Sequence, residues 1–191
     1  MILFGSASDD LPVLANGRVL MRLPTMTDFA VWAAARTDSA DFLRPYEPTW
    51  PADDLTRSAF RQRVRRNARE ARDKSAFAFL LFRAGDSELL GGLTLSNVRF
   101  GVARSCFLGY WMARRHAGQG YMPEAVVAAL AFAFDELGLH RVEASTLVDN
   151  ERSIRLLRNA GFVEEGLSHA YLLIDGRWQD HLRFARVNPA D

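Results

Sequence analysis

Two glycines stand close together near the middle of the chain, in the segment RRHAGQGYMPEA (residues 114–125). Gly118 and Gly120 come just before a long apolar run that is typical of a helix. A glycine turn at the start of a helix exposes backbone N–H groups, and the positive end of the helix dipole lies beside them. Because this arrangement binds anions, the segment is a candidate site for a phosphate or a pyrophosphate.

Three phosphate-binding patterns can be compared with this segment. The P-loop pattern, GxxxxGK followed by Ser or Thr, does not occur in the chain. A dinucleotide-binding fingerprint needs a third glycine where Pro123 stands. The third pattern is Arg or Gln followed by xxGxG, in which successive N–H groups wrap the pyrophosphate of coenzyme A. Arg115, Gly118 and Gly120 match it, although a structural turn would have the same sequence.

A second block of polar residues follows further along, in NERSIRLLRNAGF (residues 150–162). Asn150 and Ser153 are three residues apart near the start of an expected helix, so they lie on one side of it. Oxygen-bearing side chains at a helix start are placed to donate a proton to a leaving group bound there. The alternative is that Asn150 only caps the helix while Ser153 faces solvent.

These two blocks together resemble the signature of the GCN5-related N-acetyltransferase (GNAT) superfamily. The chain is most similar to its RimJ/RimL branch, the ribosomal-protein-alanine N-acetyltransferases. The blocks that carry the likeness to the RimJ subgroup occur in the same order: LRPYEPTW, LSNVRFG, FLGYWM, GQGYMPEA, LHRVEA and YLLIDGRWQDH. The resemblance covers residues 18–187, with an N-terminal extension at 1–17 and a tail at 188–191. It implies a single α/β domain of the GNAT type, with a mixed, mostly antiparallel twisted sheet, flanking helices and splayed central strands.

The resemblance also implies acetyl-CoA as the co-substrate, without a metal ion. The thioester is expected along Tyr110, Trp111 and Met112, where a backbone N–H can stabilise the tetrahedral oxyanion. The other residues expected to bind the coenzyme are Arg115, His116, Gly118, Gln119, Gly120, Tyr121, Asn150 and Ser153. The chain departs from its relatives at two positions. Leu157 stands where many members carry a tyrosine acid, and Leu172 where the RimL subgroup carries a glutamate base.

The acceptor amine determines how strong a base the reaction needs. An α-amino group has a pKa of about 7.7–8.0, so roughly a tenth of it is neutral at pH 7, whereas a lysine amine is neutral at less than about one part in a thousand. An enzyme for N-terminal amines can therefore use a weak base. Glu47, between two prolines in PYEP, is the first candidate, either as the base or as a ligand of the acceptor ammonium, and Glu143 is the second.

Three functions remain open at this point. The first is acetyl transfer to the N-terminal amine of a protein, for which a ribosomal protein is the example. The second is the same chemistry on a small amine such as an amino acid, a polyamine or a drug. The third is an acyl-CoA-binding domain that docks on RNA or on another protein. The segment Arg57–Lys74 has eight basic and two acidic residues, and it is either a solvated helix face or a docking surface for RNA.

Hydrophobic periodicity and turn residues predict the elements that position these groups. We expect strands at residues 19–24, 76–82, 89–98, 105–113, 141–148, 171–174 and 181–187. We expect helices at residues 28–36, 57–74, 122–137 and 150–161. The glycine segment then connects a strand to a helix, and the order of elements predicts one α/β domain with a mixed sheet.

The composition of the chain limits its class. With 191 residues, of which 49% are hydrophobic and 25% are charged, it fits one globular domain. The longest apolar run, residues 125–134, is shorter than the roughly 20 residues of a membrane span. No secretion signal is recognisable, and a single cysteine excludes an internal disulfide, so we expect a cytoplasmic protein. The four histidines are scattered, without HExxH or cysteine pairs, so we expect no metal site.

Overall fold

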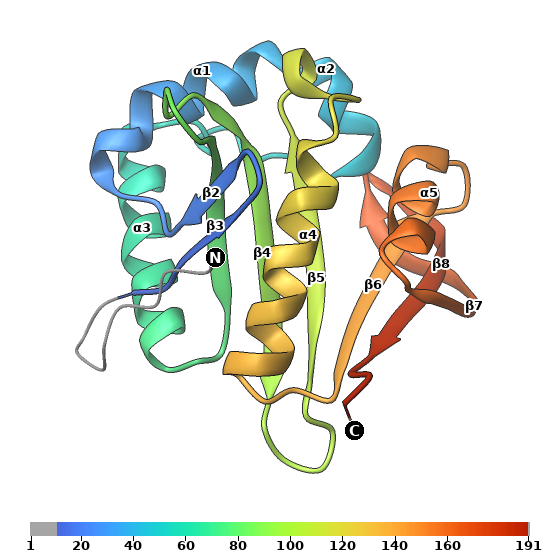
Figure 1. Ribbon diagram of the computed structural model, residues 1–191. Helices are drawn as coiled ribbons and strands as arrows, with labels where there is room; N and C mark the ends of the chain where they lie inside the picture. Colours follow the sequence, from blue (N-terminus) through green and yellow to red (C-terminus); the bar gives the residue numbers. More distant parts are fainter. Residues whose placement is uncertain (1–10, 191) are drawn as a thin grey trace.

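The computed structural model describes residues 11–190, which form one eight-stranded sheet flanked by helices (Figure 1). The strands are β1 (Val13–Asn16), β2 (Val19–Arg22), β3 (Phe77–Arg83), β4 (Leu89–Arg99), β5 (Ser105–Met112), β6 (Arg141–Leu147), β7 (Val163–Ile174) and β8 (Arg177–Val187). The helices are α1 (Phe29–Asp38), α2 (Ala40–Leu43), α3 (Arg57–Arg72), α4 (Tyr121–Ala131) and α5 (Glu151–Asn159). Three short 3₁₀ helices, η1 (Met26–Asp28), η2 (Arg44–Tyr46) and η3 (Arg114–His116), and a π-helical turn, η4 (Phe132–Glu136), complete the described elements.

The strand order is β1-β2-β3-β4-β5-β6-β8-β7, and every neighbouring pair is antiparallel except β5 and β6. Figure 1 shows α4 in front of β4 and β5, with α1 and α2 across the top of the sheet. This arrangement confirms the expected single α/β domain with a mixed, mostly antiparallel sheet.

The sheet is buried on both faces, which explains the unbroken apolar run of β3. Phe79 and Leu81 pack in the larger core under α4, whereas Leu80 and Phe82 pack on the opposite face against α1 and α3. Strand side chains alternate between faces, so a strand covered on both sides must be apolar throughout. The two cores fix β3 and β4, and β4 in turn positions β5.

The central strands splay, as expected. Parallel pairing between β5 and β6 runs only from Ser105–Arg141 to Leu108–Ala144. Beyond Leu108, β5 continues along β4 and β6 continues along β8, so the two strands separate. A gap therefore opens in the sheet beside residues 109–112, which is the segment expected to hold the thioester.

Two strands lie outside the expected boundaries. β1 falls within residues 1–17, which we expected to be an extension, yet it pairs with β2 and belongs to the sheet. β7 begins at Val163, well before residue 171. Its first half is exposed at the sheet edge and lacks the buried alternation that marks a strand. No helix among residues 11–190 is long and apolar enough to cross a membrane.

Candidate active site

The glycine segment forms a left-handed turn that leads directly into α4. Gly118 and Gly120 have φ angles of 78° and 83°, which residues with a side chain rarely adopt. Gly120 is the residue before the first turn of α4, whose leading N–H groups have no partner within the helix. The turn thus presents backbone donors at the positive end of the helix dipole, as an anion site requires.

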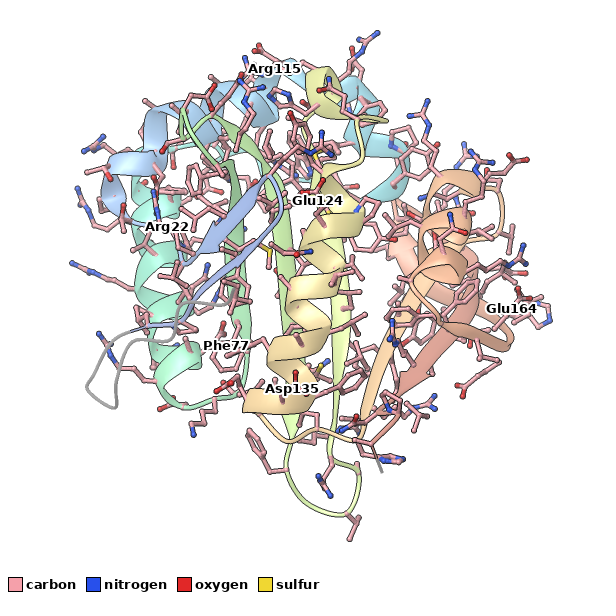
Figure 2. The ribbon with its side chains drawn as sticks, viewed as in Figure 1. Arg22, Phe77, Arg115, Glu124, Asp135 and Glu164 are labelled. Carbon is pink, nitrogen blue, oxygen red and sulfur yellow. The ribbon has the colours of Figure 1, made fainter. Side chains whose placement is uncertain are left out.

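Side chains around the turn hold it in place. Arg18 forms an ion pair with Glu124 at 2.5 Å and donates a hydrogen bond to the backbone oxygen of Gln119 at 3.1 Å. Its guanidinium also lies 4.5 Å from the centre of the Tyr121 ring. The Gln119 amide donates to the oxygen of Arg115 at 2.8 Å. Figure 2 shows Glu124 in the first turn of α4 and Arg115 in the short helix η3 above it.

Arg115 and His116 share one carboxylate. Nη2 of Arg115 lies 3.0 Å from Oε1 of Glu88, and Nε2 of His116 lies 3.3 Å from the same atom. The histidine is buried, and loss of water lowers its pKa despite the opposing effect of Glu88. Arg115 is exposed and remains available to a ligand, whereas His116 supports the loop from inside.

The backbone of β5 faces the gap at alternate residues. The N–H of Ala113 donates to Leu90 on β4 at 2.9 Å. Backbone groups alternate in direction along a strand, so those of Tyr110 and Met112 point away from β4 and towards the gap. They are free of β6 because pairing with that strand has ended at Leu108. This geometry gives a ligand in the gap both donors and acceptors.

The polar start of α5 closes the gap from the other side. The Asn150 side chain caps the helix by accepting a hydrogen bond from the Ser153 N–H at 3.2 Å. Burial raises the pKa of the Tyr110 hydroxyl to about 12, and the nearby Ser153 side chain acts in the opposite direction. Asn150 therefore has the capping role left open above, while Ser153 lies beside β5. Leu157, at the position of the family tyrosine, is buried in the core.

Glu47 lies on the sheet face opposite α4, in a polar cluster with Arg36 and Trp50. Arg36 donates to both of its carboxylate oxygens, at 2.8 and 2.5 Å, and Nε1 of Trp50 donates at 2.7 Å. The Arg36 guanidinium lies between two rings, 4.0 Å from Trp50 and 4.9 Å from Trp111 on β5. Glu47 is thus held near the thioester strand, with one donor on Oε1 and two on Oε2.

Glu143 is also paired, in this case with three arginines. Its oxygens lie 2.9 Å from Arg183, 3.4 Å from Arg141 and 3.7 Å from Arg99. The side chain is 14% exposed. Both candidate carboxylates lie on the sheet face opposite α4, and both are paired with arginine.

Several residues at the gap were not found from the sequence. Arg36 sits eleven residues before Glu47, and nothing in the helix pattern of α1 distinguishes it. Ser145 is the first residue of β6 after pairing with β5 ends, and its buried hydroxyl has no partner among the described residues. Trp50, which the sequence did not single out, and Trp111 of the expected thioester segment both have their rings against the Arg36 guanidinium. No group of three or more potential metal ligands occurs in residues 11–190.

Comparison with known proteins places these features in a family. Residues 18–163 match the model of the acetyltransferase (GNAT) domain. The chain is 34% identical over 176 residues to the ribosomal protein uS5-alanine N-acetyltransferase of Escherichia coli, covering 92% of this chain and 91% of that protein.

Solved structures agree with this assignment. The structure of Mycobacterium smegmatis RimJ in complex with CoA-disulfide superposes with a TM-score of 0.89 at 31% identity, covering 95% of this chain and 90% of that one. The ribosomal-protein-S5-alanine acetyltransferase of Vibrio fischeri gives a TM-score of 0.87 at 26% identity, covering 93% and 97%. With the splayed strands and the glycine turn, these matches show that the chain belongs to the GNAT acetyltransferase family and is an acetyl-CoA-dependent acyltransferase.

Proposed function

We propose that this enzyme acetylates the N-terminal α-amine of a protein, and that its substrate is a ribosomal protein. Support comes from the similarity to the E. coli enzyme along more than nine-tenths of both chains. The observation that carries the proposal is the gap beside Tyr110 and Met112, which has a pyrophosphate-type turn at one end and opens onto the opposite face of the sheet. Ribosomal proteins as substrates imply a cytoplasmic enzyme.

The proposal gives acetyl-CoA a defined path. The pyrophosphate binds the N–H groups of the turn around Gly118 and Gly120, with Arg115 as an outer cation. The pantetheine arm then pairs with the free backbone groups of β5. This places the thioester beside Tyr110, Trp111 and Met112, within reach of the polar start of α5.

The reaction is a direct transfer. The neutral amine attacks the thioester carbon, and a backbone N–H of β5 stabilises the oxyanion that forms. Collapse of this intermediate breaks the C–S bond. The nitrogen loses a proton to water, and the sulfur gains one from Ser153. A proton from water then returns to the Ser153 hydroxyl, so one N–H proton is released for each S–H bond formed. A thiol is an acceptable leaving group, its pKa being about 8.5 by analogy with cysteine.

The acceptor amine needs orientation more than a strong base. Since roughly a tenth of an α-amine is neutral at pH 7, water can carry away its proton. We infer that Glu47 orients the amine, because Arg36 and Trp50 fix the carboxylate and leave Oε1 able to accept one more hydrogen bond. Glu143 is the alternative from the β6 side.

Mass spectrometry of protein N-termini from cells with and without the enzyme tests the proposal. One or a few ribosomal N-termini should lose acetylation when the protein is absent. In vitro, N-terminal peptides should be better acceptors than free amino acids or polyamines. Efficient turnover of a small amine, with an unchanged set of N-termini, would contradict the proposal and favour the small-molecule function.

A contact with ribosomal RNA is proposed through α3. Arg61, Arg65 and Arg69 are exposed along one stripe of the helix and form no ion pair with any described residue. Unpaired arginines on a helix face are suited to phosphate groups. This contact would bring the enzyme to its substrate without altering the active site.

A further inference from the structure

A polar groove lies between α3 and strands β3 and β4, on the sheet face opposite α4. It has a volume of about 430 Å³, and its walls include Arg66 and Asn67 of α3. Thr94 and Ser96 of β4 lie on its floor. This face is the one that carries Trp111 and the Glu47 cluster, so the groove is on the acceptor side of the gap.

Asn67 is unusual among the residues that line the groove. It is only 5% exposed, and its side-chain amide has no hydrogen-bond partner within residues 11–190. This amide contributes no hydrogen bond to the fold, and asparagine is a poor helix former. Because Asn67 lines the groove, a ligand bound there can supply the hydrogen bonds that the protein does not.

The floor of the groove runs directly to the reaction centre. Thr94 pairs with Gly109 of β5, and Ser96 pairs with Phe107. No atom lies within 4 Å of the position that a Cβ on Gly109 would take, so the path across β5 is open. From Gly109 at the gap to Thr94 on the next strand is one strand spacing, about 4.8 Å, and from Thr94 to Ser96 is a two-residue step of about 7 Å. A peptide of about three extended residues spans this path.

We propose that the groove binds the residues that follow the acceptor's N-terminus, in an extended conformation, with Asn67 hydrogen-bonded to a peptide group of the acceptor. This inference rests on the proposed function. An asparagine amide has donors and an acceptor, so it matches a peptide group whatever the neighbouring side chain.

The charges of the groove favour a polypeptide over a nucleic acid. Arg63 is paired with Asp54 at 2.6 Å, and Arg66 lies 3.9 Å from Glu70. The arginines at this wall are therefore largely neutralised, unlike Arg61, Arg65 and Arg69 on the other side of α3. A neutral wall with one orphaned amide is complementary to a peptide backbone.

The test compares two acceptors that share their first residue, a dipeptide amide and a decapeptide amide. In Asn67→Leu and Asn67→Ala, we expect kcat/KM for the decapeptide to fall by about tenfold or more, since a lost hydrogen bond to a bound group acts in this range. The dipeptide should change by less than about twofold, because it ends before Asn67. The unfolding temperature of both variants should be unchanged or higher, since an unpaired buried amide is removed.

Gln62→Leu is the matched control, because it removes an exposed amide of α3 that does not line the groove. It should leave both acceptors unchanged. Equal effects on the two acceptors, no effect on the decapeptide, or unfolding of both Asn67 variants would overturn the inference. If the parent enzyme acetylates free amines and neither peptide, the proposed function fails first and the inference fails with it.

Discussion

At Gly120 the backbone conformation of the glycine turn disfavours any residue with a side chain. The residue has a φ of 83°, and an added Cβ would lie 3.2 Å from Nη2 of Arg18, which braces the turn. For Gly120→Val we expect the Kd for CoA to rise by about tenfold or more, because the left-handed conformation alone costs roughly 1–2 kcal/mol and the N–H groups lose their alignment. Titration calorimetry measures the change.

Gly101→Val serves as the control for this substitution. Gly101 lies in the exposed loop between β4 and β5, with open space where a Cβ would be added. CoA binding should be normal in that variant. Normal binding in Gly120→Val as well would mean that the turn has only a structural role.

Glu47 should behave as a positioning residue with a structural cost. Arg36 is 9% exposed and Glu47 is 19% exposed, so Glu47→Gln leaves a buried guanidinium without its counter-charge. Breaking a buried pair typically costs about 3–5 kcal/mol. We expect a lower unfolding temperature together with a lower kcat/KM for peptides, while the Kd for CoA stays normal.

Thermal unfolding and peptide kinetics on the same preparation distinguish the roles of Glu47. A general base would instead give a fall in kcat of about 10²–10⁴ with an unchanged unfolding temperature. If Glu47→Gln keeps full activity while Glu143→Gln loses it, the base belongs on β6.

His116 makes the folded enzyme sensitive to acid. Desolvation holds its pKa below the ordinary value of about 6.5, so the unfolded chain binds its proton at a higher pH than the folded protein does. The free energy of unfolding should therefore fall as the pH drops below about 6.5. In His116→Gln this slope should be smaller, as measured by denaturant unfolding between about pH 5 and 7.

His169→Gln is the comparison, because that histidine is largely exposed at 78%. Its substitution should leave most of the acid slope in place. An identical slope in the parent and in His116→Gln would show that the acid sensitivity has another source.

The site residues that could be predicted from the sequence are those that belong to a local turn or helix start. The site residues that could not be predicted have partners far away in the sequence. Gly118, Gly120 and Asn150 act through the turn or helix start in which they stand, so their spacing was informative. Arg36 contacts Glu47, and Asn67 lines a groove formed with β4. Neither contact is visible in the neighbouring sequence, and the pattern around Asn67 indicates only a basic helix.

At the scale of elements, α3 has two surfaces with different charge. Replacing Arg61, Arg65 and Arg69 by Glu should abolish salt-sensitive ribosome association, because the stripe changes from attracting to repelling phosphate. Peptide turnover should persist, since these residues lie away from the groove wall formed by Asn67. Cosedimentation with ribosomes at several salt concentrations measures the effect.

Asp73→Ala, at the residue that follows α3, is the control for the triple variant, because it makes this surface slightly more basic. Its ribosome association should be kept or strengthened. Unaffected association in the triple variant, or none in the parent protein, would identify the stripe as an ordinary solvated face.

The elements themselves were predicted unevenly. α3, α4 and the strands β3 to β6 were expected within a few residues, since buried alternation, apolar runs and glycine boundaries mark them. β1 and the first half of β7 were missed because they are short or exposed and carry no alternation. The position of β8 between β6 and β7 depends on long-range pairing, which no local pattern encodes.

For the whole molecule, coenzyme binding should appear as increased stability. A ligand that binds only the folded state adds about 2.7 kcal/mol at a hundredfold excess over its Kd. Acetyl-CoA or CoA should therefore raise the unfolding temperature, and NADH should not, because Pro123 replaces the third glycine of a dinucleotide fingerprint. Differential scanning fluorimetry with both ligands is sufficient, and a shift with NADH alone would reverse the assignment.

The separation of β5 from β6 beyond Leu108 also bears on how the two substrates meet. A sheet that opens on both faces lets the donor and the acceptor arrive from opposite sides and meet in one complex. No covalent carrier is then required, and the chain offers none at this point: burial raises the pKa of the Cys106 thiol to about 12, and its side chain faces the core. On this geometry the acetylated acceptor and spent CoA would leave by separate routes, so neither product would have to wait for the other.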